Sequence, residues 1–334
     1  MRKREIHTNM AGTTAKRAPR NRTLTLSAER LAQLRKKLEC PETNLSAETM
    51  RDRIFCGDFF RLIHLFPAHC ADLMVIDPPY NLSKNFHGLN FSRKKDAGYL
   101  EYLESWFPGL LRLLKPGGSV YLCGDWQCSA AEYQVLSRHL TVRNRIVWQR
   151  EKGRGAAKNW KNGCEDIWFA TAGNQYYFNA DAVKLRRKVL APYRGRDGQP
   201  KDWEATENGK FRMTSPSNFW DDVTVPYWSM PENTDHPTQK PEKLIAKLIL
   251  ASSRPGDLVF DPFMGSGTTA VTARKLGRHF AGIELNPEYC CWALERLERA
   301  EKNPAIQGYS DGVFWERNTE KEQSSAGRKK RTES

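Results

Sequence analysis

The sequence lacks the cysteine and histidine patterns of metal-binding and disulfide-bonded proteins. Its 334 residues include eight cysteines, none of which forms a Cys-x-x-Cys pair or a cluster with zinc-ligand spacing. The chain also has no apolar N-terminal signal region, no apolar run long enough to cross a membrane and no internal repeat. We therefore predict a cytoplasmic protein with reduced thiols, no bound metal and no membrane segment.

Acidic residues are fewer than basic residues in this sequence. The chain has 53 lysines and arginines against 39 aspartates and glutamates, which gives a formal net charge of +14. Such an excess favours a polyanionic partner, and nucleic acid is the first candidate. Part of the excess lies at the two ends. There we predict a basic extension with a short helix over residues 1–48 and a basic, flexible tail over residues 302–334.

Strand and helix patterns alternate through most of the chain. Short apolar runs, which are typical of buried parallel strands, occur at residues 53–58, 72–76, 119–123, 258–260 and 279–283. Helical periodicity occurs at residues 25–38, 99–114, 128–140, 241–252, 268–276 and 287–300, and residues 115–118 (KPGG) predict a helix end. The alternation predicts an α/β fold with a mostly parallel twisted sheet and helices on both faces.

One stretch of the chain interrupts this alternation. Residues 145–149 and 166–171 are predicted to pair as an antiparallel sheet edge. Residues 173–235, which follow them, are irregular and rich in arginine, lysine, glycine, proline, tryptophan and tyrosine. We predict that they are an insertion in one domain, whose two halves cover residues 49–172 and 236–301.

A glycine-rich turn at residues 261–267 (DPFMGSG) lies between a predicted strand and a helix. In an open parallel sheet this position faces the ligand crevice, and glycine lets the backbone approach a bound group. A glycine-rich turn alone is weak evidence, but Glu284 ends the next strand, where an acid can bind both hydroxyls of a ribose. The sequence has no phosphate-binding loop of the G-x-x-x-x-G-K-[ST] type. A nucleoside-containing cofactor is favoured.

Asp77, Pro78, Pro79 and Tyr80 directly follow a predicted buried strand. An ordinary turn also uses aspartate and proline, but this combination with an aromatic residue suits a particular chemistry. The lone pair of an aromatic exocyclic amine is delocalised into the ring, so the amine is a poor nucleophile. A carboxylate and a backbone carbonyl that accept hydrogen bonds from its two N–H groups draw the nitrogen towards tetrahedral geometry. The target base must leave the duplex to reach such a pocket.

Residues 77–80, 261–267 and 236–241 (HPTQKP) together resemble the signature motifs of the amino-methylating DNA methyltransferases. The catalytic motif precedes the cofactor motif, with a basic insertion between them, which is the circularly permuted order of the β group. The resemblance covers roughly residues 53–300. It implies a Rossmann-like domain that binds S-adenosylmethionine, with a catalytic half, an inserted target-recognition region and a cofactor-binding half in that order.

The resemblance also implies roles for individual residues. Asp77 would accept a hydrogen bond from the target amine, Pro78 would supply its carbonyl, and Tyr80 would stack on the base; Pro79 completes this catalytic motif. The residues implied in cofactor binding are Asp58, Asp261, Phe263, Gly265, Ser266, Gly267, Thr268, Glu284, Asn286, His236, Thr238 and Lys240. Those implied in DNA binding are Arg186, Arg187, Lys188, Arg194 and Arg196. Without the resemblance, His236 or Lys240 would be taken as an ordinary loop residue.

The sequence therefore predicts a site-specific DNA methyltransferase that acts on adenine N6 in double-stranded DNA. It would flip the base and transfer the methyl group by direct displacement. Asp77 favours adenine, because enzymes of this family that act on cytosine N4 more often carry serine at its position. The alternatives are a cytosine-N4 enzyme, an RNA or protein methyltransferase and an inactive DNA-binding homologue. A second copy of the chain and a companion restriction endonuclease are further partners to consider.

Overall fold

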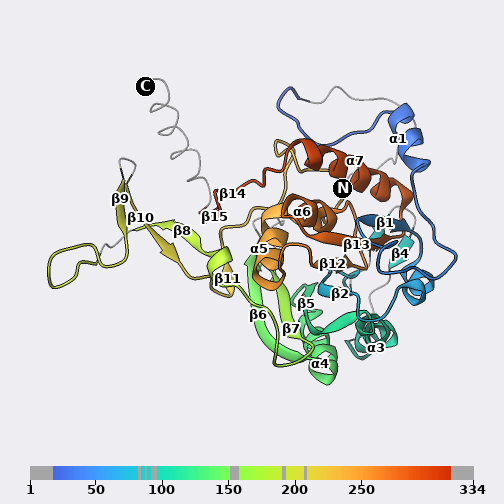
Figure 1. Cartoon of the computed structure of the whole chain (residues 1–334), viewed down its shortest axis with the longest axis horizontal. Coiled ribbons are helices and arrows are strands. Elements are labelled where there is room, and N and C mark those ends of the chain that lie inside the picture. The colour runs from blue at the N-terminus through green and yellow to red at the C-terminus, as the bar shows by residue number, and fades with distance from the viewer. Residues whose placement is uncertain are drawn as a thin grey trace.

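An eight-stranded sheet forms the centre of the computed structural model (Figure 1). The structure describes residues 18–81, 84–86, 89–91, 96–150, 158–189, 193–206 and 209–316. The strands lie in the order β1 (Arg53–Cys56), β13 (His279–Glu284), β12 (Leu258–Asp261), β2 (Ala71–Ile76), β5 (Leu114–Gly124), β7 (Cys164–Thr171), β6 (Thr141–Gln149) and β11 (Phe219–Trp220). Neighbours from β1 to β5 are parallel. This confirms the predicted mostly parallel sheet.

The predicted antiparallel pair also forms, but it does not make the sheet edge. β7 is antiparallel to both β5 and β6 and lies between them. The short strand β11 then pairs with β6 in parallel and becomes the outermost strand. The insertion predicted over residues 173–235 therefore contributes one strand to the central sheet.

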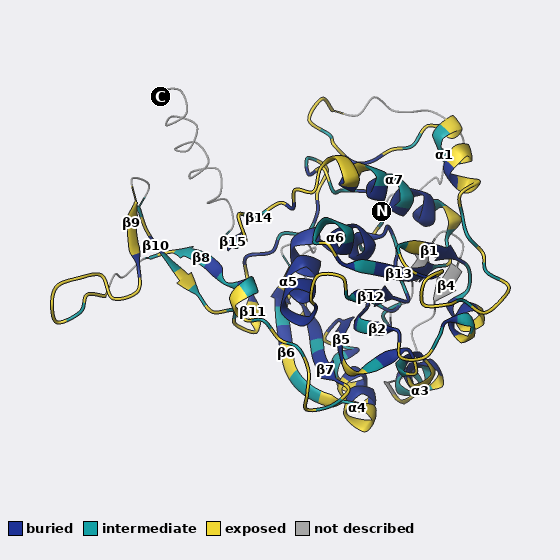
Figure 2. Ribbon diagram, in the orientation of Figure 1, coloured by how far each residue is buried: buried dark blue, intermediate teal, exposed yellow. Residues whose placement is uncertain are grey.

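Alternating side chains of the strands supply two hydrophobic cores, as the two-residue period of a strand requires. Met74 and Ile76 of β2 belong to one core, whereas Leu73 and Val75 belong to the other. The first core is closed by α2 (Phe59–Leu62), η1 (Ile63–Leu65), α3 (Asp96–Leu111) and α4 (Ser129–His139). The second is closed by α5 (Glu242–Ser252), α6 (Thr268–Lys275) and α7 (Pro287–Lys302). Figure 2 shows the buried strands between these layers.

Most predicted helices are confirmed with small shifts of their ends, and two predictions need correction. Helix α1 (Ala28–Arg35) is capped by Ser27, whose side chain accepts from the Arg30 amide, and it is shorter than predicted. The glycines of residues 115–118 do not end a helix, because α3 has already ended and β5 begins at Leu114. The pairing of β5 with β2 shifts register here, so the missing N–H of Pro116 interrupts no regular ladder.

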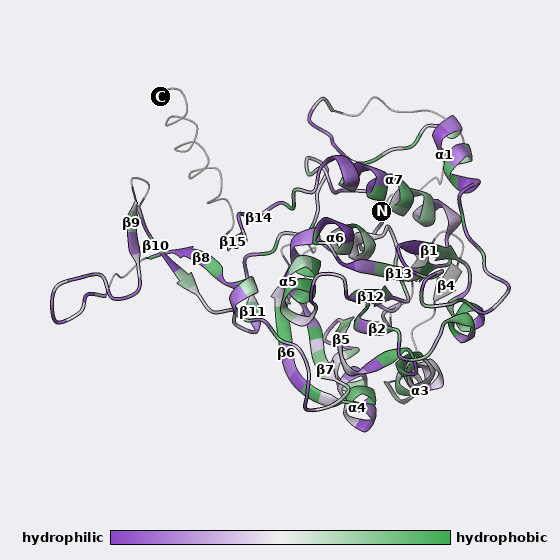
Figure 3. Ribbon diagram, viewed as in Figure 1, coloured by the Kyte–Doolittle hydropathy of each residue, from purple (hydrophilic) through white to green (hydrophobic). Residues whose placement is uncertain are grey.

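A second, smaller sheet extends from the main body (Figure 1). Its strands lie in the order β14 (Tyr309–Ser310), β15 (Val313–Trp315), β8 (Leu185–Lys188), β10 (Gly209–Thr214) and β9 (Glu204–Thr206). Turn η2 (Asp181–Val183) leads into it. β3 (Lys84–Phe86) and β4 (Leu89–Phe91) form a separate antiparallel hairpin. Figure 3 shows that hydrophilic residues dominate β9, in contrast to the central strands.

The small sheet corrects the flexible tail predicted from residue 302. Residues 309–310 and 313–315 are strands, and β15 pairs in parallel with β8. Phe314 anchors this segment because its side chain is fully buried against α5 and η2. Strands of two to four residues are too short for a periodic sequence signal. The rest of the predicted tail, residues 317–334, lies outside the described residues.

In the parts of the chain that the structure describes, no helix is both long enough and apolar enough to cross a membrane. Over the same residues, no group of histidine, cysteine and acidic side chains is arranged to hold a metal ion. All eight cysteines are free thiols.

Candidate active site

Two of the three motif segments, residues 77–80 and 261–267, meet Glu284 at one end of the central sheet, and residues 236–241 line the same place. Asp77 follows β2, Asp261 ends β12 and Glu284 ends β13, and these three strands are parallel neighbours. The carboxyl ends of parallel strands are where open sheets of this kind bind ligands. A cavity of about 30 Å³ lies there. Its lining residues include Asp77, His236, Thr238, Gln239, Lys240, Asp261, Phe263, Met264, Gly265, Ser266 and Thr268.

The Asp77 carboxylate is bound by two side chains. Tyr80 Oη donates to Asp77 Oδ1 at 2.9 Å, and Lys240 Nζ donates to Asp77 Oδ2 at 2.7 Å. Lys240 Nζ also lies 3.0 Å from Tyr80 Oη. Pro78 is buried and Pro79 half-buried, and the two prolines end the strand so that Tyr80 turns back onto Asp77. Tyr80 therefore contacts Asp77 through its hydroxyl group. The role predicted for Tyr80, stacking on the base, would use the face of its ring.

The charges of this group are set by burial and by close opposite charges. Burial by itself would lower the pKa of Lys240, but the nearby carboxylates of Asp77 and Glu165 outweigh it and the net pKa is raised. Burial and the charges of Asp77 and Glu165 raise the pKa of Tyr80. The lysine is therefore charged and the phenol protonated near neutral pH, so both act as donors to Asp77.

Glu165 belongs to the same group, although the sequence analysis missed it. Its side chain is only 4% exposed, and its Oε2 lies 3.4 Å from Lys240 Nζ and 3.4 Å from Tyr80 Oη. Its other oxygen pairs with Arg150. Glu165 is near the start of β7, and β7 runs antiparallel to β5, so its first residues reach the edge where the parallel strands end. The predicted antiparallel pairing of residues 166–171 was the sequence signal that could have located it.

The glycine-rich turn has a backbone that requires glycine at two positions. Gly265 and Gly267 have φ of 54° and 81°, in the left-handed region. A Cβ atom on Gly265 would lie 3.0 Å from His236 Nε2, so glycine keeps the turn and the HPTQKP segment in close contact. A Cβ atom on Gly267 would lie 2.4 Å from the Cβ of Ala293 in α7. This glycine therefore allows close packing of α7 beneath the turn.

We expect Gly267→Ala to destabilise the fold by about 2–6 kcal/mol, the sum of an overpacking term and backbone strain of the usual sizes. Gly277→Ala is the matched control, because Gly277 has a similar φ of 71° and no atom within 4 Å of the position of a Cβ. Urea unfolding of both variants measures the difference. Equal losses of stability would contradict the close contact between Gly267 and Ala293.

Two acids brace the turn. Asp261 accepts from the Phe263 amide at 2.9 Å and from Thr269 Oγ1 at 2.6 Å, and burial raises its pKa to about 7. Glu284 accepts from the Gly265 amide at 2.8 Å and from the Asn286 amide at 2.7 Å. Burial raises the pKa of Glu284, against these hydrogen bonds. The acid predicted to bind a ribose is thus tied to the glycine turn.

A buried arginine that the sequence analysis did not single out holds the start of α6. Arg296 is 5% exposed and donates to the Ser266 carbonyl at 2.8 Å and to Thr268 Oγ1 at 3.0 Å. Its charge is balanced by Glu242 at 3.1 Å. Ser266 and Thr268, both predicted cofactor residues, are therefore oriented by α7.

The remaining predicted cofactor residues lie around the same edge. His236 packs its ring 4.4 Å from the ring of Tyr289 and receives a hydrogen bond from the Thr238 amide at 3.3 Å. Asn286 caps α7, and Asp58 caps α2 after β1, the strand next to β13. The structure therefore brings the HPTQKP segment onto the glycine turn, with Asp58 one strand further along the sheet.

The predicted DNA-binding residues lie apart from this cavity, on the small sheet and its loops. Arg186 lies over the rings of Phe211 and Trp315, 5.3 Å from each ring centre. Arg187 pairs with Asp221 at 2.8 Å. The backbone amide of Lys188 donates to Glu316, Arg194 donates to the Gly198 carbonyl, and Arg196 is exposed.

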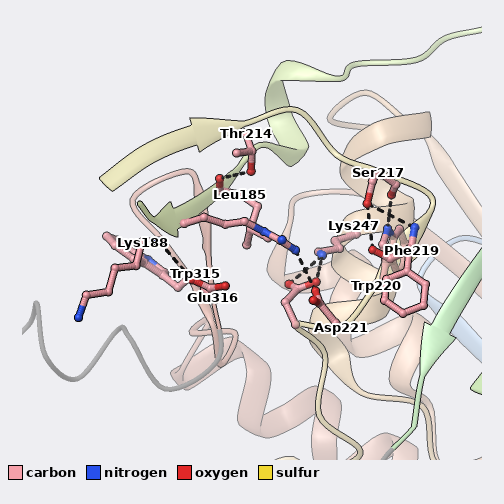
Figure 4. Close-up of polar contacts among 12 residues, drawn as sticks. Leu185, Lys188, Thr214, Ser217, Phe219, Trp220, Asp221, Lys247, Trp315 and Glu316 are labelled. Carbon is pink, nitrogen blue, oxygen red and sulfur yellow. Dashed lines mark hydrogen bonds and ion pairs between the residues drawn. The ribbon is translucent and has the colours of Figure 1, made fainter. Parts of the chain in front are cut away.

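The small sheet joins the main body at a polar junction (Figure 4). Lys247 of α5 pairs with the buried Asp222 at 2.7 Å, and Lys243 pairs with the same carboxylate at 2.7 Å. A cavity of about 140 Å³ opens beside this junction. Its lining residues include Arg187, Arg212, Thr214, Ser217, Phe219, Trp220, Asp222 and Lys247. Each of the three cationic side chains at this cavity has an acidic partner: Arg187 pairs with Asp221, Arg212 with Asp202 and Lys247 with Asp222.

Comparisons with known proteins agree with this geometry. A profile of the DNA methylase family matches residues 71–295. The DNA adenine methyltransferase YhdJ of Escherichia coli (strain K12) is 37% identical over 254 residues, 74% of this chain and 83% of that protein. The type II methyltransferase M.HpaI of Haemophilus parainfluenzae is 32% identical over 256 residues, 75% of each chain. The solved structure of the PvuII DNA methyltransferase, described as cytosine-N4-specific, is 18% identical to this chain and has a TM-score of 0.55. The match covers 87% of this chain and 95% of that one, and it shows that the two share a fold.

Proposed function

Because the chain belongs to the DNA methylase family, we propose that it transfers a methyl group from S-adenosylmethionine to adenine N6 at specific sites in duplex DNA. The observation that carries this proposal is the position of Asp77, which lines one cavity together with the glycine turn. A methyl donor held by the turn and an amine held by Asp77 would then lie next to each other. The relative named DNA adenine methyltransferase supports adenine as the base.

The residues of the turn fit this cofactor. A side chain at Gly265 would meet His236, so glycine lets the turn and His236 close together beside the cavity. Phe263, Ser266 and Lys240 line the cavity beside it, and Glu284 stands at the end of the next strand, where a ribose acid is expected. When bound, S-adenosylmethionine supplies an electrophilic methyl group on a good leaving group. The work of the chain is therefore orientation and electrostatic stabilisation.

In the proposed reaction, Asp77 accepts a hydrogen bond from one N–H group of the target amine, and the Pro78 carbonyl accepts a hydrogen bond from the other. The amine nitrogen gains positive charge as it attacks, and the carboxylate of Asp77 stabilises that charge. Tyr80 donates to Asp77 Oδ1 and fixes the orientation of the carboxylate. No residue of the chain forms a covalent bond to the base in this scheme, which is a direct in-line displacement.

Recognition of DNA is assigned in this proposal to the insertion at residues 173–235, with β14 and β15 as its structural support. The halves at residues 49–172 and 236–301 would supply catalysis and cofactor binding. The arginines of β8, one of which lines the junction cavity, support phosphate contacts there. The relative named a type II methyltransferase supports a companion restriction endonuclease that cuts the same sequence.

We expect Arg187→Ala to weaken DNA binding about equally for all sequences. Loss of one phosphate contact lowers the slope of log affinity against log salt concentration by about 0.9. Arg299→Ala is the matched control, because Arg299 is also a surface arginine paired with one carboxylate, at 2.9 Å, but lies on α7. Binding to duplex DNA at several salt concentrations, measured by fluorescence anisotropy, gives both slopes. The same slope for Arg187→Ala and the wild type would contradict the phosphate contact.

The substrate class is tested by transfer of tritium from labelled S-adenosylmethionine. We expect incorporation into unmethylated duplex DNA and none into RNA of the same length and sequence. Incorporation into RNA alone would overturn the proposal.

A further inference from the structure

The Lys240 ammonium donates to the carboxylate oxygen that, in the proposed function, must bind the target amine. Lys240 Nζ lies 2.7 Å from Asp77 Oδ2. The Lys240 ammonium and the target amine are both nitrogen donors to this carboxylate. Tyr80 takes the other oxygen, Oδ1, at 2.9 Å. Both oxygens of Asp77 are therefore bound by donors of the chain itself. A carboxylate can accept further hydrogen bonds, but a base that enters the pocket meets an Asp77 whose charge is already paired with the Lys240 ammonium.

Lys240 is the donor whose charge opposes the transfer. During transfer the amine nitrogen becomes positively charged. A buried ammonium on the same carboxylate repels that charge at short range, because the site screens charges weakly. The Lys240 side chain is only 8% exposed, so water screens it little. Tyr80 is neutral and does not oppose the developing charge.

Glu165 is placed to receive the ammonium. Its Oε2 already lies 3.4 Å from Lys240 Nζ, so a small movement of a flexible lysine tip shortens this contact and lengthens the one to Asp77. The Glu165 side chain is 4% exposed, and its position is fixed by Arg150 on the other oxygen. A buried ammonium that left Asp77 without another carboxylate would be an unpaired buried charge, which is strongly unfavourable.

We propose that the Lys240 ammonium and the target amine alternate on Asp77, and that Glu165 is the positioning residue that takes up the ammonium when the amine binds. This inference rests on the proposed function of Asp77. The exchange breaks one N–H···O contact at Asp77 and forms one at Glu165, and no proton is transferred. Lys240 keeps Asp77 paired and oriented before the base arrives, and Glu165 frees Asp77 for the reaction.

The test is a double-mutant cycle on Glu165 and Lys240. Glu165→Gln removes the anionic acceptor, so the ammonium stays on Asp77. We expect kcat on unmethylated plasmid DNA to fall about 10- to 100-fold, the range for loss of a hydrogen bond to a charged group. The Kd for S-adenosylmethionine, measured by calorimetry, should stay within about twofold, since only the competing donor is affected. Adding Lys240→Met to Glu165→Gln removes the competing donor and should restore at least about tenfold of the lost kcat.

The matched control is the buried pair of Asp222 and Lys247, which are joined at 2.7 Å in the junction with the small sheet. Asp222→Asn and Lys247→Met, alone and together, should show no such rescue of kcat. A Glu165→Gln enzyme with wild-type kcat, or a double variant no faster than Glu165→Gln, would overturn the inference. If Glu165→Gln does not fold, Lys240→Met alone decides: removal of the competing donor should lower KM for DNA, and an unchanged or higher KM would overturn the inference. Failure of the wild-type enzyme to methylate DNA would instead refute the proposed function.

Discussion

Replacing Asp77 by alanine is expected to lower kcat for DNA methylation by about a thousandfold or more, an effect at or beyond the upper end of the range for one preorganised transition-state contact. The variant loses the acceptor for the target amine. Without Asp77, Lys240 and Arg150 share the Glu165 carboxylate. The pocket therefore gains net positive charge where the amine becomes cationic.

The cofactor should still bind to Asp77→Ala. Asp77 makes its contacts with Tyr80 and Lys240, whereas Glu284 and Asp261 brace the glycine turn. Calorimetry with S-adenosylmethionine should therefore give a Kd within a few-fold of the wild-type value. Asp77→Asn keeps the shape of the side chain and loses only its charge, so it separates charge from packing. Retained turnover in Asp77→Ala would refute the catalytic role of this residue.

Replacing Glu284 by alanine is expected to weaken the binding of S-adenosylmethionine by about 10- to 100-fold, as loss of hydrogen bonds to a charged group does. The carboxylate would no longer be available to ribose hydroxyls. The amides of Gly265 and Asn286 would also lose their acceptor, which loosens the turn. Calorimetry gives the Kd, and kcat at saturating cofactor should remain within about tenfold of the wild-type value.

Glu284→Gln is the matched control, because its amide oxygen can still accept one of the two backbone bonds. We expect it to bind more weakly than the wild type but more tightly than Glu284→Ala. Thermal unfolding of both variants reports the structural part of the loss. An unchanged Kd in Glu284→Ala would contradict the predicted contact with the cofactor.

The sequence predicts the sheet and its motif edge because these depend on local signals. A buried strand is a short apolar run, and the residue that ends it is marked by the residues that follow, such as the prolines after Asp77 or the glycines after Asp261. Parallel strands then bring these ends together without further information. For this reason the fold class and the position of residues 77–80 and 261–267 at one edge of the sheet could be predicted from the sequence.

The partners of Asp77 could not be predicted in the same way. Lys240 is 163 residues away along the chain, and Tyr80 and Glu165 are 85 residues apart. Their meeting depends on the position of β7 between β5 and β6, which is a property of the whole sheet. The same is true of β15, whose pairing with β8 joins distant segments that carry no periodic signal.

Mass analysis of nucleosides identifies the base that the enzyme methylates. Unmethylated duplex DNA is incubated with the enzyme and S-adenosylmethionine, digested to nucleosides and separated by liquid chromatography with mass detection. We expect N6-methyladenine as the product, which Asp77→Ala should not produce. N4-methylcytosine as the sole product would contradict it.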